Sequence, residues 1–129
     1  MTESKIDLTE KQRSNLSSKR VWKVLIIDDS RSDRRIYRRF LAPLSDEQTV
    51  VEITDAASGL EGLELIESVT PDLILLDFRL PDTNGIELLG RIRKLTEAPI
   101  IFITGEPAPL MQTQAYAHGI LIYLAKDFL

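Results

Sequence analysis

Short apolar runs alternate with amphipathic segments along most of the chain, and this alternation predicts its secondary structure. The apolar runs predict β-strands, which we place at residues 24–27, 50–54, 73–77, 100–104 and 120–125. Apolar positions at helical spacing predict helices between them, around residues 36–44, 60–69, 86–95 and 110–117, with Ser30 or Ser32 capping the first. Strands that are apolar on both faces indicate parallel pairing beneath helices. With right-handed crossovers, the pattern predicts a doubly wound α/β fold around a five-stranded parallel sheet.

The two ends of the chain depart from this pattern. Residues 1–20 are polar, have only three large aliphatic side chains and no periodicity, and predict a mobile arm before a domain at 21–129. Only four residues follow the fifth strand, so the predicted fold lacks the helix that would close its second face. An uncovered apolar face predicts either a homodimer, with Phe128 and Leu129 at its seam, or a natural chain that continues past Leu129 and supplies the helix.

Composition excludes several classes of protein. A length of 129 residues suits one domain, and a net charge of −4 disfavours a nucleic-acid binder. No apolar run approaches the ~20 residues that span a membrane, and the start of the chain has no apolar signal segment, so we expect a cytoplasmic protein. The absence of cysteine and the single His118 exclude thiol catalysis and His-rich zinc sites. Any metal must therefore be held by oxygen.

Polar residues end four of the predicted strands. They are Asp28 and Asp29 after the first strand, Asp77 in the third, Thr104 in the fourth and Lys126 after the fifth. Because carboxyl ends of parallel strands share one edge of the sheet, we expect these side chains to meet there. Three carboxylates in one pocket repel one another and favour Mg²⁺ as the compensating cation, with Ca²⁺ and Mn²⁺ as alternatives. A divalent ion beside a carboxylate is also what phosphoryl transfer to that carboxylate requires.

Four segments in this order resemble the receiver domain of two-component response regulators: VLIIDDSRSDRR, DLILLDFRLPDTNG, IIFITG and IYLAK. The resemblance extends from Val21 to Lys126 and implies a flavodoxin-like strand order 2-1-3-4-5. It implies a phosphorelay protein that takes a phosphoryl group from a sensor histidine kinase or phosphotransfer protein and then changes its protein contacts. No separate substrate is implied, so the protein is not expected to be an enzyme in the usual sense.

The resemblance also implies a role for each site residue. Asp77 matches the phosphoacceptor, and Lys126 and Thr104 match the groups that bind its phosphoryl oxygens. Thr104 and Tyr123 match the residues that switch on activation. The implied Mg²⁺ ligands are Asp29, Asp28 through water, Asp77 and the backbone carbonyl of Arg79.

Other functions remain open from the residues alone. An aspartate-nucleophile, Mg²⁺-dependent phosphohydrolase is one, although such enzymes have a second acid two residues after the nucleophile, where this chain has Arg79. A degenerate receiver that only binds partners is another, and the complete set of site residues disfavours it. A flavodoxin-like FMN binder is disfavoured because the acidic segment after the first strand would repel phosphate.

Overall fold

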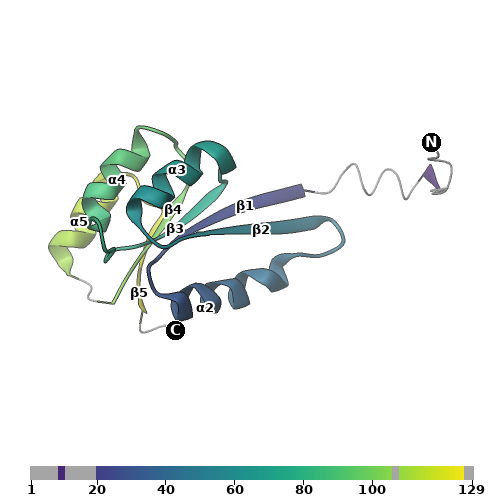
Figure 1. The fold of residues 1–129 in the computed structure, drawn as a ribbon, viewed down its shortest axis with the longest axis horizontal. Coiled ribbons are helices and arrows are strands. Elements are labelled where there is room, and N and C mark those ends of the chain that lie inside the picture. The colour runs from purple at the N-terminus through teal and green to yellow at the C-terminus, as the bar shows by residue number, and fades with distance from the viewer. Residues whose placement is uncertain (1–8, 11–19, 106–107, 127–129) are drawn as a thin grey trace.

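Five strands and four α-helices alternate in the part of the chain that the computed structural model describes, residues 9–10, 20–105 and 108–126 (Figure 1). The strands are β1 (Arg20–Ile27), β2 (Thr49–Ala56), β3 (Leu73–Asp77), β4 (Ile100–Thr104) and β5 (Ile122–Ala125). The α-helices are α2 (Arg31–Leu41), α3 (Gly59–Val69), α4 (Gly85–Arg93) and α5 (Pro109–Ala117), and a 3-10 turn, η2 (Ala42–Leu44), follows α2.

The strands form one sheet in the order β2-β1-β3-β4-β5, with every neighbouring pair parallel. The predicted α/β fold and its strand order are therefore confirmed. The register aligns Asp77 with Ile103 and Thr104 with Ala125. As a result, the polar residues at the carboxyl ends of neighbouring strands come to the same edge of the sheet.

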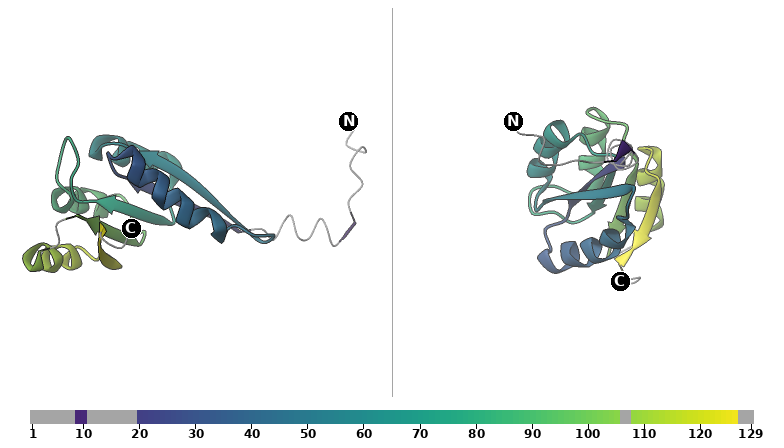
Figure 2. Two further views of the ribbon diagram at one scale, coloured as in Figure 1. Left: turned by 90° about the horizontal axis from the view of Figure 1, so that it is seen from below. Right: turned by 90° about the vertical axis from the view of Figure 1, so that its right-hand side faces the viewer.

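Helices α3, α4 and α5 cover one face of the sheet, and α2 lies on the other (Figures 1 and 2). Alternate residues of each strand point to opposite faces, so the sheet supplies two cores. Beneath α3, α4 and α5, buried strand residues pack against buried helix residues; among them are Leu25, Ile27, Ile74, Leu76, Phe102, Leu63, Ile66, Leu88, Leu89, Ile92 and Ala115. Beneath α2, the buried residues are Val24, Ile26, Leu75, Ile103 and Tyr37.

Three helices begin at a polar side chain that accepts a backbone hydrogen bond. Ser30 accepts from the amide of Asp33, which decides between the two predicted caps of α2. Ser58 caps α3 and Asn84 caps α4 in the same way. Such caps satisfy N–H groups that have no partner within the helix and so fix where each helix begins.

Several details differ from the sequence prediction. Strand β1 begins at Arg20, because residues before the apolar run still pair with β2, and Arg20 donates to the Gln48 carbonyl at 2.8 Å. The rest of the predicted arm lies outside the described residues apart from 9–10. Leu60 and Phe40, predicted on the apolar sides of their helices, have exposed fractions of 58% and 57%. Helical periodicity gives the direction of an apolar stripe but not how wide a stripe the sheet can cover.

The α2 side of the sheet carries less helical cover than the other side. The described residues include no helix after β5, as predicted, and Phe128 and Leu129 lie outside them. On this side the strand residues Leu73, Ile101 and Leu124 are only partly buried. Within the described part of the chain, no helix has the length and apolar character needed to cross a membrane.

Candidate functional site

Four strands deliver polar side chains to one edge of the sheet. Asp28 directly follows β1, Asp77 ends β3, Thr104 ends β4 and Lys126 directly follows β5. The first three of these are almost fully buried, with exposed fractions of 1%, 5% and 1%. Buried polar groups at the ends of apolar strands need partners, and the site supplies them.

Three carboxylates form a cluster at this edge. Asp28, Asp29 and Asp77 each bring a carboxylate oxygen to within 4.8 Å of the other two, and Asp29 is the exposed member. Like charges at such separations repel by a few kcal/mol, about 3–4 at an effective dielectric constant of 20. Oxygen ligands in this number and spacing fit a hard divalent cation such as Mg²⁺.

The Lys126 ammonium lies among the acids and is their shared counter-charge. Its Nζ is 3.1 Å from Asp77 Oδ1 and 3.3 Å from Asp28 Oδ2. Its shortest contact, 2.7 Å, is to Oδ2 of Asp33. Asp33 is the third residue of α2 and was not among the predicted site residues. The sequence signal available was its place in the first turn of a helix that begins just after the acidic pair.

Burial controls the protonation of the site. Desolvation raises the pKa of Asp77 to about 6, the negative charge of Asp28 adds to the shift, and Lys126 opposes it. Burial also raises the pKa of Asp28. Burial alone would lower the pKa of Lys126, but its hydrogen bond to Asp33 and the charge of Asp28 outweigh it and raise that pKa. At neutral pH, Asp77 is therefore mainly a carboxylate that faces an ammonium.

Asp28 is held in place from several directions. Its Oδ1 accepts from the Ser30 amide at 2.8 Å, and its Oδ2 accepts from the Tyr37 hydroxyl at 3.3 Å. Arg34 Nη1 donates to the Asp28 backbone carbonyl at 2.7 Å. These bonds fix the orientation of a carboxylate that its neighbours would otherwise repel.

A small cavity opens onto Asp77. Asp29, Asp77, Arg79, Gly105 and Lys126 line it. A Cβ placed on Gly105 would lie 3.9 Å from Cδ of Lys126, so the position beside Thr104 is uncrowded. The cavity gives an incoming group a direct approach to the Asp77 carboxylate.

Tyr123 lies beside the site on the α5 side of the sheet. Its ring stacks on Phe102 with ring centres 5.6 Å apart and an angle of 9° between the planes. Its hydroxyl accepts from the Ala108 amide at 3.3 Å and donates to the Met111 sulfur at 3.4 Å. The ring therefore links β5 to α5 and to the loop that precedes it.

Residues 24–129 match the family model of the response regulator receiver domain. The chain belongs to this family. Receiver domains are signalling modules rather than conventional enzymes, and they generally bind Mg²⁺ through an acidic pocket. In this chain, Asp28, Asp29 and Asp77 form a cluster of acidic side chains. The receiver-domain resemblance predicted from the four sequence segments is confirmed.

Individual relatives agree with this assignment. The receiver domain is 33% identical over 102 residues to the luminescence regulatory protein LuxO of Vibrio campbellii, a match that covers 78% of this chain and 21% of LuxO. The chain thus spans about a fifth of the length of that relative. A CheY-like receiver domain protein from Methanospirillum hungatei has a similar structure, with a TM-score of 0.74, 29% identity and 82% of each chain covered.

A third relative bears on the chemistry. A response regulator protein from Burkholderia pseudomallei, solved with a phosphorylated aspartic acid, a calcium ion and citrate, matches with a TM-score of 0.72 and 25% identity. The match covers 81% of this receiver domain and 59% of that chain.

Proposed function

We propose that this receiver domain accepts a phosphoryl group on Asp77 and thereby changes its contacts with other proteins. The observation that carries the proposal is the placement of Asp77, a buried carboxylate that opens onto a cavity, 3.1 Å from an ammonium and beside two further acids. The phosphorylated aspartic acid in the Burkholderia pseudomallei relative supports the same chemistry here.

In the proposed step, an oxygen of the Asp77 carboxylate attacks the phosphorus of a phosphohistidine on a sensor kinase or phosphotransfer protein. The new bond joins that oxygen to phosphorus, and the bond between phosphorus and the imidazole nitrogen breaks. The bonding electron pair stays on the nitrogen, which leaves as neutral imidazole after taking up a proton. No oxidant or reductant is needed, and the product is an acyl phosphate on Asp77.

The acidic pocket would hold Mg²⁺ for this reaction. Asp29 and Asp77 would bind it directly, Asp28 would do so through water, and the Arg79 backbone carbonyl would complete the protein ligands. When bound, the ion neutralises the negative charge that the phosphoryl group brings into an acidic site. The fit rests on carboxylate oxygens within 4.8 Å of one another.

Lys126 and Thr104 would bind the phosphoryl oxygens. Lys126 needs no large movement, because its Nζ is already 3.1 Å from Asp77 Oδ1. Thr104 is buried at the end of β4, the strand next to β3. A change in Thr104 would reach Tyr123 through β5, which pairs with β4, and would alter the contacts of the Tyr123 hydroxyl with Ala108 and Met111.

The proposed partners are a phosphohistidine donor and an output protein in the cytoplasm, with no role for nucleic acid or a membrane. Helix α2 offers a surface for an acidic donor protein. Arg34 and Arg38 pair with Asp55 at 3.6 and 3.0 Å, whereas Arg31 and Arg35 are exposed on the same helix. Exposed surface charge of this kind steers association more than it adds affinity.

A phosphohydrolase is the less favoured alternative. The position two residues after Asp77 is Arg79, which lines the cavity and places a guanidinium in the chain where such an enzyme needs a carboxyl group. A receiver that only binds partners would take up no phosphoryl group at all. A test of phosphoryl uptake and release separates the three functions.

The test is incubation with acetyl phosphate and Mg²⁺, followed by intact-mass measurement. We expect one labile phosphoryl adduct on the wild-type protein, none on Asp77→Asn, and an unchanged adduct on Asp46→Asn. Asp46 is a matched control because it lies before β2, at the amino ends of the strands and so at the opposite end of the sheet from Asp77. There its side chain accepts hydrogen bonds from the Gln48 and Thr49 amides. Comparable labelling of Asp77→Asn would overturn the proposal, and catalytic release of phosphate from other phosphoesters would favour the phosphohydrolase.

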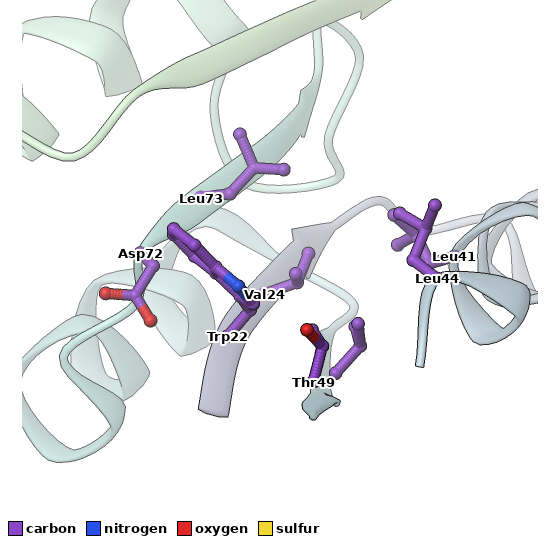
Figure 3. A pocket seen from close by; sticks show the side chains of 8 residues that line it. Trp22, Val24, Leu41, Leu44, Thr49, Asp72 and Leu73 are labelled. Atoms are coloured by element: carbon purple, nitrogen blue, oxygen red, sulfur yellow. The ribbon is translucent and has the colours of Figure 1, made fainter. Parts of the chain in front are cut away.

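We also propose that a second copy of this chain covers the α2 side of the sheet. There the Trp22 indole, 44% exposed, lines a groove together with Val24, Leu41, Leu44 and Leu73 (Figure 3). Two such faces match each other in polarity, and their burial would remove apolar surface from water.

Sedimentation equilibrium tests this dimer. We expect the wild-type protein to form a dimer and Trp22→Lys to be shifted toward the monomer. Val21→Lys is the matched control, because Val21 is 45% exposed and its side chain points to the opposite face of β1. A wild-type protein that stays monomeric at high concentration contradicts the dimer.

A further inference from the structure

Asp33 makes the shortest contact of the Lys126 ammonium. Its Oδ2 is 2.7 Å from Lys126 Nζ, compared with 3.1 Å for Asp77 and 3.3 Å for Asp28. The two side chains have similar exposed fractions, 23% for Asp33 and 22% for Lys126. The pair therefore lies at the mouth of the site, partly shielded from water, where an ion pair with a short hydrogen bond is stronger than on an open surface.

The backbone of α2 fixes the position of Asp33. The Asp33 amide donates to Ser30 Oγ at 3.2 Å, and the Ser30 amide donates to Asp28 Oδ1 at 2.8 Å. One serine thus links the backbone of Asp33 to the Asp28 carboxylate of the acidic pocket. A long lysine side chain has many rotamers, so an anchored partner at its tip restricts where the ammonium can lie.

The charges at the site explain why this contact matters. An ammonium has three protons, and within the described part of the chain the Lys126 ammonium forms ion pairs with three carboxylates: Asp28, Asp33 and Asp77. When a phosphoryl group is attached to Asp77, the lysine must share its charge between that group and Asp33. Asp33 therefore both fixes the ammonium and offsets part of its attraction for an anion.

We propose that Asp33 is a positioning residue for Lys126 that weakens the hold of the site on phosphoryl groups and strengthens its hold on the metal cation. This inference rests on the proposed function. If Asp33 has this role, its removal should change the affinities for the phosphoryl donor and for the metal cation in opposite directions. Removing the Asp33 charge should favour an anionic phosphoryl donor and disfavour a cation, because one negative charge leaves the site and Lys126 keeps its full positive charge.

The test uses Asp33→Asn, which keeps the shape of the side chain and an oxygen acceptor but removes the charge. We expect the half-saturating concentration of acetyl phosphate to fall by about threefold to tenfold, and the dissociation constant of Mg²⁺, measured by calorimetry, to rise by a similar factor. Asp33→Glu restores the charge and should return both values toward those of the wild-type protein. Asp46→Asn, which loses the same charge far from Lys126, should change neither value.

The outcomes separate this inference from the proposed function. A loss of affinity for both ligands in Asp33→Asn would indicate structural damage and overturn the inference. Values equal to those of the wild-type protein would also overturn it, while phosphorylation of the wild-type Asp77 would leave the proposed function standing. Absence of wild-type phosphorylation would overturn both.

Discussion

Asp82 caps α3 from a position 23 residues further along the chain, where its Oδ1 accepts a hydrogen bond from the Gly59 amide at 2.8 Å. Its Oδ2 accepts from the Leu60 amide, also at 2.8 Å. Asp82 belongs to the loop that joins β3, which ends in Asp77, to α4. The bidentate contact therefore ties the loop after Asp77 to the beginning of a neighbouring helix.

Replacing Asp82 with alanine should lower the free energy of unfolding by about 1 kcal/mol, because two helix amides lose their acceptor. Urea denaturation of Asp82→Ala and the wild-type protein measures the difference. Asp82→Asn should cost less, since its amide oxygen can still accept one bond. Equal unfolding midpoints for wild type and Asp82→Ala would mean that the cap does not contribute.

The same cap should depend on pH. Hydrogen bonds from Gly59 and Leu60 lower the pKa of Asp82 below that of an unfolded chain. A carboxyl group of this kind adds stability above its unfolded pKa, about 3.9, and the contribution is lost as the pH falls through the lower folded pKa. We therefore expect the difference between wild type and Asp82→Ala to shrink below about pH 4.

Two helical glycines should respond oppositely to alanine. A Cβ on Gly59 would meet Thr83 Cγ2 at 2.6 Å, in the loop that carries Asp82, so Gly59→Ala should destabilise the protein. A Cβ on Gly90 would lie at an ordinary contact distance, 3.6 Å, from Cε1 of His118. Gly90→Ala should therefore stabilise by about 0.5–1 kcal/mol, the helix propensity of alanine over glycine. Chemical denaturation of both variants tests the pair, and a destabilised Gly90→Ala would contradict the packing described here.

Arg93 joins α4 to the turn before β5. Its guanidinium donates to four backbone carbonyls, those of Thr96, Ala98, His118 and Gly119, at 2.9–3.2 Å. Lysine cannot reproduce this planar set of donors, so Arg93→Lys should cost about 2 kcal/mol of unfolding free energy. Arg91→Lys, at an exposed position of the same helix, should stay within about 0.5 kcal/mol of the wild-type protein. Equal losses of unfolding free energy in Arg93→Lys and Arg91→Lys would contradict the stabilising role of the Arg93 guanidinium.

The raised pKa of Asp77 predicts a stability change with pH. Because the folded pKa, about 6, exceeds the unfolded value, the folded state holds more protons between about pH 4 and 6, and stability falls as the pH rises through that window. Asp77→Asn removes this cost and should raise the free energy of unfolding at pH 7 by about 2 kcal/mol without Mg²⁺.

Mg²⁺ and pH provide the controls for that variant. Saturating Mg²⁺ should stabilise the wild-type protein more than it stabilises Asp77→Asn. The difference in free energy of unfolding between the two proteins should therefore become smaller. At about pH 4, where Asp77 is protonated in the folded state, the gap should also narrow. Thermal melts of both proteins, with and without Mg²⁺ and at about pH 4 and pH 7, measure both effects. A stability difference between the two proteins that does not depend on pH would show that the buried charge is not its cause.

The sequence was sufficient to predict the sheet and the residues at its edge. Apolar runs that end in Asp28, Asp77 and Thr104 carry both the strand signal and the polar residue, so predicting each strand also places its terminal side chain. Parallel order then brings those ends together without further information. Lys126 follows the same logic after β5.

Contacts made by long or distant side chains could not be predicted in this way. The pairing of Asp33 with Lys126 joins residues 93 positions apart and depends on how far a lysine reaches across two strands. The Asp82 cap and the four carbonyls around Arg93 depend on loop conformations that have no periodic pattern. The exposure of Leu60 and Phe40 depends on how much of each helix the sheet covers.

Locating the phosphoryl group along the chain is the decisive test of Asp77 as its acceptor. After incubation with acetyl phosphate and Mg²⁺, borohydride converts an aspartyl phosphate to homoserine, which peptide mass spectrometry can assign to one position. We expect homoserine at position 77 and at no other acid of the site. Homoserine at position 28, 29 or 33, or no conversion in a protein that carries a labile phosphoryl group, would contradict it.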